Sequence, residues 1–227
     1  MKKQLIFLAI LVSGVLGARG QGSESFTNVI SAAPTDWTQL VALPKFNSTL
    51  GLLTSIDISV SSSMGTDIQI TNRSLSPSSG RAKTEVQISL DNATYGNLFG
   101  QGGQGNAVLD YFSQPKFDYS LTGGQSVSSG TLTGSQSLTT GVITSPSVLS
   151  GFTGNGYVDL NAATTTYQSI VNTGGNSTMT QQTSAGLTTI ITYDYTPLTP
   201  APEPSSVAMM VAGLAGLGTV LRRRMAK

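Results

Sequence analysis

The sequence predicts an all-β protein: an antiparallel β-sandwich, jelly-roll-like or Ig-like, flanked by an N-terminal signal peptide and a C-terminal single transmembrane helix. Three observations lead to this prediction. Apolar and polar residues alternate through the central part of the chain, Gly, Ser, Asn and Pro clusters interrupt the alternation about every ten residues, and each end carries a short apolar segment. The chain therefore divides into residues 1–20, 21–199 and 200–227.

The first segment, MKKQLIFLAILVSGVLGARGQ, has the three parts of a secretory signal peptide. A basic start, MKK, precedes an apolar stretch, and small residues follow that stretch. We expect cleavage between Gly20 and Gln21, with Gly17 and Ala18 as alternative sites. An uncleaved anchor is the competing interpretation, but the apolar stretch from residue 5 to residue 17 is shorter than the roughly 20 residues of a membrane span.

The central segment, residues 21–199, is predicted to consist of strands with one buried face. TSIDISV, DIQI, EVQISL, KFDYSL and LTTIITYDY all alternate with a period of two. The residues that this pattern places on buried faces are Thr54, Ile56, Ile58, Val60, Ile68, Ile70, Val86, Ile88, Leu90, Phe117, Tyr119, Leu121, Leu187, Thr189, Ile191, Tyr193 and Tyr195.

Two Gly-rich stretches in the middle of the chain leave more than one interpretation open. GNLFGQGGQGNAV and GGQSVSSGTLTGSQSLTTG fit long loops, weak polar edge strands or a disordered insert. The glycines at 100, 102 and 105 match the dinucleotide-binding fingerprint as a string. That fingerprint requires a strand before it and a long helix after it, and Pro115 follows too soon for such a helix. The match is therefore interpreted as accidental.

Composition excludes several classes of function. The chain contains neither Cys nor His, which removes disulfide frameworks, Cys/His zinc sites and nucleophile–histidine triads. Residues 21–201 hold five Lys and Arg against ten Asp and Glu, a difference of −5. A segment with this charge offers no basic face to neutralise phosphates, so no nucleic-acid partner is expected.

The acidic residues and the single tryptophan were considered as sites. A pair of carboxylates would suit glycoside hydrolysis, but the candidates are scattered along the predicted strands and are interpreted as solvent-facing. These candidates are Asp57, Asp67, Glu85, Asp91, Asp110, Asp118, Asp159 and Asp194. Calcium is possible but cannot be located, and no other cofactor is expected. Trp37 and the tyrosines are expected to pack in the core or against a sheet edge rather than to stack on sugars.

The last segment, residues 200–227, combines three features. Pro202, Glu203 and Pro204 come first, and the prolines prevent helix formation at that point. An uncharged run from residue 205 to residue 221 follows, which as a helix would extend about 26 Å, a minimal membrane span. The basic cluster Arg222, Arg223 and Arg224 then predicts a cytoplasmic end, by the positive-inside rule.

This arrangement resembles the PEP-CTERM sorting signal. The resemblance covers about 26 residues at the end of the chain and includes all three features. It implies recognition of residues 202–204 by exosortase, a membrane-embedded cysteine transpeptidase of exopolysaccharide-producing Gram-negative bacteria. An ordinary C-terminal anchor is the alternative. Ala208, Ala212 and Gly216 also lie four residues apart, so a helix would carry them on one stripe that we consider for docking against the enzyme.

The body resembles the choice-of-anchor E domain. The resemblance rests on LPKFNSTLGLLTSIDISVSSSMGTDIQITN, LSGFTGNGYVDLNA and TYDYTP, and would span residues 24–197. Families of this kind carry one extracellular domain on differing C-terminal anchors. The resemblance implies no catalytic motif, and it implies that body and tail are separable modules.

The sequence thus predicts an exported surface or matrix protein rather than an enzyme. We expect its C-terminal helix to hold it transiently in the membrane. The resemblance to the PEP-CTERM signal further implies that this is the inner membrane of a Gram-negative bacterium and that the processed protein is associated with exopolysaccharide. A carbohydrate- or calcium-binding adhesin and a glycan-active enzyme are the alternatives.

The first testable prediction concerns the N-terminus of the exported protein. Because signal peptidase cleaves after small residues, the mature chain should begin at or near Gln21. N-terminal sequencing or intact-mass measurement of the exported protein checks this prediction. Recovery of exported chains that still carry Met1 would show that the first segment is an uncleaved anchor.

Overall fold

The computed structural model describes residues 20–91, 94, 98–99, 107–110, 116–198 and 213. Within this part of the chain, nine strands form two antiparallel sheets, accompanied by the short helix α1 (Pro146–Gly151). Except for Gly20 and Gly213, the predicted signal peptide and the predicted C-terminal span lie outside the described residues.

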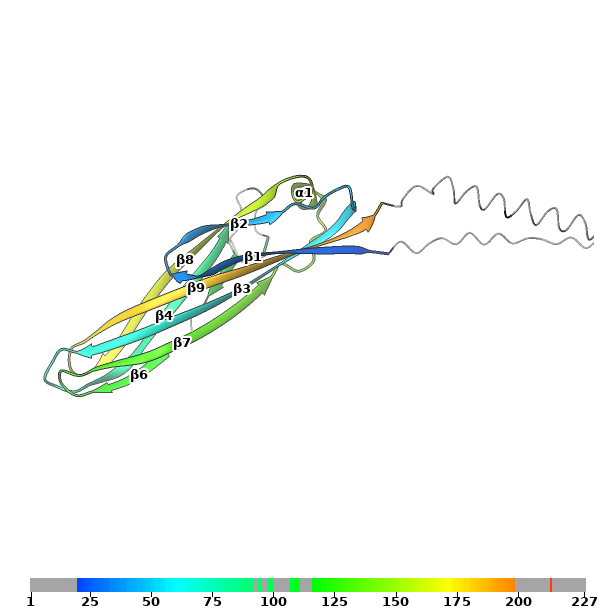
Figure 1. Cartoon of the computed structure of the whole chain (residues 1–227). Helices are drawn as coiled ribbons and strands as arrows, with labels where there is room; N and C mark the ends of the chain where they lie inside the picture. The colour runs from blue at the N-terminus through cyan, green and yellow to red at the C-terminus, as the bar shows by residue number, and fades with distance from the viewer. Residues whose placement is uncertain are drawn as a thin grey trace, which may run out of the picture.

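The two sheets lie face to face in an elongated body (Figure 1). Sheet A holds, in spatial order, β1 (Gly22–Pro34), β9 (Ser177–Pro197), β3 (Gly51–Asn72) and β7 (Ser126–Thr139). Sheet B holds, in spatial order, β2 (Thr38–Pro44), β8 (Tyr157–Thr173) and β4 (Ser78–Asp91), with β5 (Ala107–Asp110) and β6 (Lys116–Leu121) both paired to β4.

The strand order identifies the sandwich as a jelly roll. β1 pairs with β9, β2 with β8, β3 with β7 and β4 with β6, so the first half of the chain runs antiparallel to the second half. Such a chain is a long double strand that has been wrapped into two sheets. The sequence predicted a sandwich that was either jelly-roll-like or Ig-like, and these strand pairings are those of a jelly roll.

The core lies between the sheets, where the predicted alternation places apolar side chains. Ile58 and Ile191 from sheet A and Val86 and Leu160 from sheet B are almost completely buried in one cluster. A second, smaller cluster around Ile68 and the residues of β6 fills the far end of the body. The predicted buried positions are confirmed with three exceptions: Phe117 and Tyr195 are half-buried, and Thr54 is exposed.

The prediction that Thr54 shares the face of Ile56 is wrong because of a β-bulge. In the pairing of β3 with β9, Leu53 lies opposite Tyr195 and Ser55 lies opposite Asp194, so Thr54 is an extra residue. An extra residue reverses the alternation beyond it. Leu53 and Ile56 therefore both point into the core, although three positions separate them.

The Gly- and Ser-rich stretch around residues 126–139 is a strand and not a disordered insert. It forms β7, which lies at the edge of sheet A and pairs with β3. The pairing begins where Ser59 lies opposite Thr139 and ends where Thr71 lies opposite Ser126. The edge-strand interpretation is thus confirmed for this stretch. The Ser and Gly cluster at residues 61–65 does not interrupt β3 either, which extends over 22 residues. The interruptions about every ten residues were therefore a poor guide to strand ends.

One buried side chain, that of Asn72, joins the three connections at the far end of the body. Its Nδ2 donates to the carbonyl oxygens of Ser76 (2.8 Å) and Thr122 (3.1 Å). Its Oδ1 accepts from the backbone N–H groups of Ser74 (3.1 Å) and Asn176 (3.4 Å). These partners belong to the β3–β4, β6–β7 and β8–β9 connections, so a single amide fixes the tip of the body.

Replacement of Asn72 by Ala should lower the free energy of unfolding by about 3 kcal/mol, because it removes these bonds and leaves buried backbone groups without partners. The measurement is chemical denaturation of residues 21–199 expressed alone. We expect this segment to be soluble, to give a β-type circular dichroism spectrum and to melt cooperatively. Asn47→Ala is the matched control, since Asn47 is exposed and its side-chain Oδ1 accepts hydrogen bonds from the neighbouring Thr49. Equal effects of the two substitutions would contradict the role of Asn72.

Candidate functional site

The sorting signal predicted from the sequence lies almost wholly outside the described residues. This applies to Pro202, Glu203 and Pro204, to Arg222, Arg223 and Arg224, and to the stripe Ala208, Ala212 and Gly216. Gly20 and Gln21, the predicted cleavage site of the signal peptide, are described and are exposed directly before β1. A search for membrane-spanning helices among the described residues finds none.

The structure shows where the sorting signal joins the body. Gly22, the first residue of β1, lies opposite Tyr195, near the end of β9, and Pro197, the last residue of β9, lies opposite Gly51. The N-terminus and the C-terminus of the body therefore lie at the same end of the sandwich. The strand that leads to the tail, β9, lies between β1 and β3 (Figure 1). The amide of Leu198 still donates to the carbonyl of Leu50 (3.3 Å). The chain is therefore held by hydrogen bonds until four positions before Pro202.

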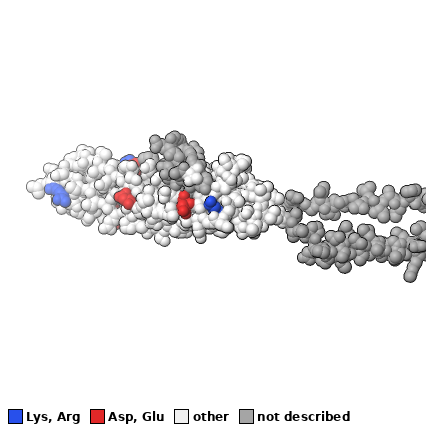
Figure 2. Space-filling model, turned by 90° about the horizontal axis from the view of Figure 1, so that it is seen from above, with Lys and Arg blue, Asp and Glu red and all other residues white. Residues whose placement is uncertain are grey.

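The acidic candidates whose side chains the structure describes are spread over the outer faces of both sheets. Seen from above, the few charged side chains lie singly or beside one of opposite sign, and wide uncharged areas separate them (Figure 2). Asp57 and Asp194 lie at diagonal positions on β3 and β9, and each accepts hydroxyl hydrogen bonds: Asp57 from Thr139 (2.7 Å) and Asp194 from Ser55 (3.2 Å). Over the described part of the chain, no group of three or more acidic side chains is placed to hold a metal ion.

Asp118 on β6 forms an ion pair with Arg81 on β4, with 2.6 Å between Nε and Oδ1. The hydrogen bond from the guanidinium lowers the pKa of Asp118, and the same bond raises the pKa of Arg81. The two residues lie opposite each other in the pairing of β4 with β6, and both side chains are more than half exposed, so the pair contributes little to stability. The side chains of Asp91 and Asp110 are not described.

The aromatic candidates divide into packed and exposed residues. Trp37 packs against the core and donates from Nε1 to the carbonyl of Ala185 (3.2 Å), which confirms the packing interpretation. Tyr193 is fully buried and its hydroxyl donates to the carbonyl of Pro44 (2.6 Å). Tyr157 and Tyr167, both on β8, are instead exposed. The glycines at 100, 102 and 105 lie outside the described residues.

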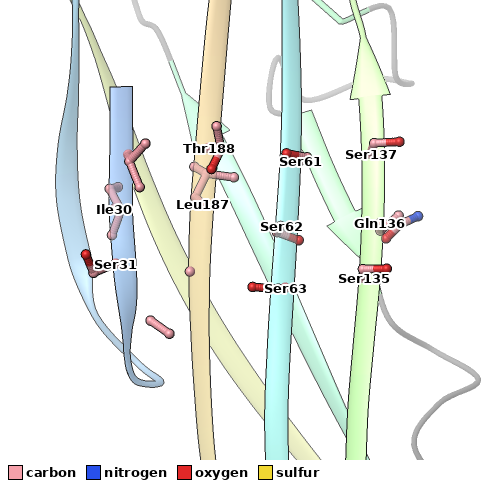
Figure 3. A pocket seen from close by; sticks show the side chains of 13 residues that line it. Ile30, Ser31, Ser61, Ser62, Ser63, Ser135, Gln136, Ser137, Leu187 and Thr188 are labelled. Atoms are coloured by element: carbon pink, nitrogen blue, oxygen red, sulfur yellow. The ribbon is translucent and has the colours of Figure 1, made fainter. Parts of the chain in front are cut away.

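The outer face of sheet A carries a hollow that the sequence analysis did not predict. Its volume is about 480 Å³, and it is floored by β1, β9, β3 and β7 side by side (Figure 3). Ser61 and Ser63 on β3 face it beside Ser135 and Ser137 on β7, and Gly186 on β9 lacks a side chain there. Each strand shows only a Ser- or Thr-rich sequence. The pairing of the strands places these hydroxyls side by side, and the sequence of one strand alone does not predict that pairing.

Comparison with protein families finds one match. Residues 200–224 match the PEP-CTERM protein-sorting motif, a range that begins two residues after the last described residue of the body and includes the predicted tail features. The motif implies processing by exosortase and is consistent with export to the cell envelope or surface. No curated protein matches the chain.

Among solved structures, the chain is similar to those of infectious bursal disease virus. The Gx strain structure is 11% identical with a TM-score of 0.20, over 77% of this chain and 38% of that chain. The VP2 subviral particle is 9% identical with a TM-score of 0.18, over 79% of this chain and 38% of that chain. The chain thus spans less than half of the viral proteins it matches, and at these TM-scores the likeness carries no conclusion about fold or function.

Proposed function

We propose that this protein is an exported surface or matrix protein, in which exosortase processes the C-terminal signal and delivers the jelly-roll body to an exopolysaccharide-associated layer outside the cell. The observation that carries the proposal is the sorting motif at residues 200–224, which directly follows the last strand of a complete sandwich. The body and the tail are then separable modules, as the resemblance to the choice-of-anchor E domain implies.

The position of the tail supports delivery in a fixed orientation. Five residue steps join Pro197, the last residue of β9, to Pro202, and they extend at most about 17 Å. The processing enzyme must therefore act close to the end of the sandwich where β9 and β1 meet. The Asn72 tip lies at the opposite end of β3, whose 22 residues span about 70 Å. A protein held at its C-terminus would present this tip away from the membrane.

In this proposal the tail residues have separate roles. Pro202, Glu203 and Pro204 form the extended peptide that the enzyme recognises. The apolar run holds the chain transiently in the inner membrane of a Gram-negative bacterium, and the arginines at 222–224 stop its export. The small residues at 208, 212 and 216 allow close approach of a helix from the enzyme.

Replacement of Glu203 by Ala should abolish removal of the tail, because Glu203 belongs to the peptide that the enzyme recognises. Membrane insertion should remain intact, because Glu203 lies before the apolar run at residues 205–221 and a neutral residue there does not weaken insertion. The measurement is immunoblotting of membrane and extracellular fractions from cells that contain the exosortase. Glu85→Ala is the matched control, since it removes the same charge from the body, and its processing should equal that of the wild type. Normal processing of Glu203→Ala would make the segment an ordinary anchor.

The triple substitution of Ala208, Ala212 and Gly216 by Leu tests the small-residue stripe separately. Leu favours insertion at least as well as Ala or Gly, so the tail should still enter the membrane, but bulky side chains should slow its removal. A pulse-chase measurement of tail removal gives the rate. Removal at the wild-type rate would exclude a role for the stripe without affecting the role of residues 202–204.

A further inference from the structure

The hollow on sheet A is one part of a longer trough. A second hollow shares Ser63 and Ser135 with the first and continues to Gly65. A third shares Gly65 with the second and continues to Asp67, and a fourth shares Asp67 with the third. The four hollows follow β3 from Ser61 to Gln69, a distance of about 26 Å. Together they form one trough along β3, and its third part also extends past the edge of β9 to Thr166 and Gln168 on β8 of sheet B.

The polar groups of the trough are mainly hydroxyls and amides, and they alternate with apolar side chains such as Val29 and Leu187. Ser, Thr and Gln side chains from five strands, β1, β3, β7, β8 and β9, line the trough. Gly65 leaves its floor low, since no neighbouring atom would lie closer than 3.8 Å to a Cβ at that position. Among the residues that the structure describes, Asp36 and Asp67 are the only charged ones that line the trough, and no Lys, Arg or aromatic residue does so. The carboxylate of Asp67 accepts a hydrogen bond from Ser128 (2.7 Å) and stays at the surface.

We propose that this trough binds an extended, neutral polysaccharide chain that lies along β3. A polysaccharide presents hydroxyl groups along its length, and the trough offers donors and acceptors for such groups over several sugar units. An anionic chain would meet two carboxylates and no cation, so the electrostatics favour a neutral one. The inference rests on the proposed function, because it assigns the polysaccharide contact of the exported body to one face.

The absence of aromatic side chains in the lining determines how the binding should behave. Without stacking, each sugar is held by hydrogen bonds that compete with water, and each bond contributes little. Affinity must then accumulate along the chain. A short oligosaccharide should bind weakly, and a polymer of the same sugar should bind much more tightly.

The experiment is affinity electrophoresis of the full-length chain, purified in a sugar-free non-ionic detergent from cells without exosortase. Native gels contain a neutral polymer (hydroxyethyl cellulose, mixed-linkage β-glucan, galactomannan or dextran) or an anionic one (carboxymethyl cellulose or alginate). Mobility is divided by the mobility of the same protein in a gel without polymer. At least one neutral polymer should retard the protein, and the anionic polymers should not.

Ser63 provides the decisive variant because it lines two of the hollows and is exposed (Figure 3). Ser63→Arg should raise the dissociation constant about tenfold by blocking the trough and removing a hydroxyl. Ser63→Thr should bind as the wild type does. Thr165→Arg is the matched control, since Thr165 is an exposed mid-strand residue of sheet B, opposite Gln87, and the substitution makes the same change of charge.

Each other outcome overturns the inference. Retardation by none of the neutral polymers excludes the trough as their site, and retardation by anionic polymers alone contradicts the charge argument. Equal losses in Ser63→Arg and Thr165→Arg place binding elsewhere or make it non-specific. The assay needs no processing of the tail, so failure here leaves the sorting proposal intact, and normal processing of Glu203→Ala leaves this inference intact.

Discussion

The pairing of β3 with β9 is the constraint on which the rest of the structure depends. The two strands stay paired from Gly51 opposite Pro197 to Asn72 opposite Ser177, with one bulge at Thr54, and each also holds an outer neighbour, β7 or β1. Their inward side chains, among them Ile58 and Ile191, supply much of the core. A slip of one residue would turn these side chains to water, so burial fixes the register. The same register aligns the hydroxyls of the outer face into a trough.

Periodicity predicted the buried faces of the strands well, because alternation depends on each strand alone. It failed at Thr54, where a bulge inserts one residue, because a bulge is a property of the strand pair. The composition of β7 did not distinguish strand from linker, since that strand is stabilised by its partner β3 rather than by its own apolar content. The role of Asn72 and the trough depend on contacts between distant segments, which the local sequence does not encode.

The two outer faces of the sandwich differ in chemistry although both are polar. Sheet B carries Arg81, Lys83, Glu85 and Asp118, partly in ion pairs. Sheet A carries mainly hydroxyls and amides around the trough. Small side chains allow a ligand to approach the backbone closely, whereas long charged ones keep their own hydration. A contact with an uncharged polymer is therefore easier to form on sheet A.

The place of β9 in the topology determines when the body can fold. β9 is the last strand in the sequence, yet it lies inside sheet A between β1 and β3. A chain exported from its N-terminus would reach the outside with β1 and β3 still lacking their shared neighbour. In the proposed export, the sandwich could close only after residue 197 has crossed, and the predicted membrane-spanning run follows only eight residues later. Completion of the fold and arrest of export would then coincide, and slow pairing of distant strands would occur while the chain is tethered rather than free to aggregate.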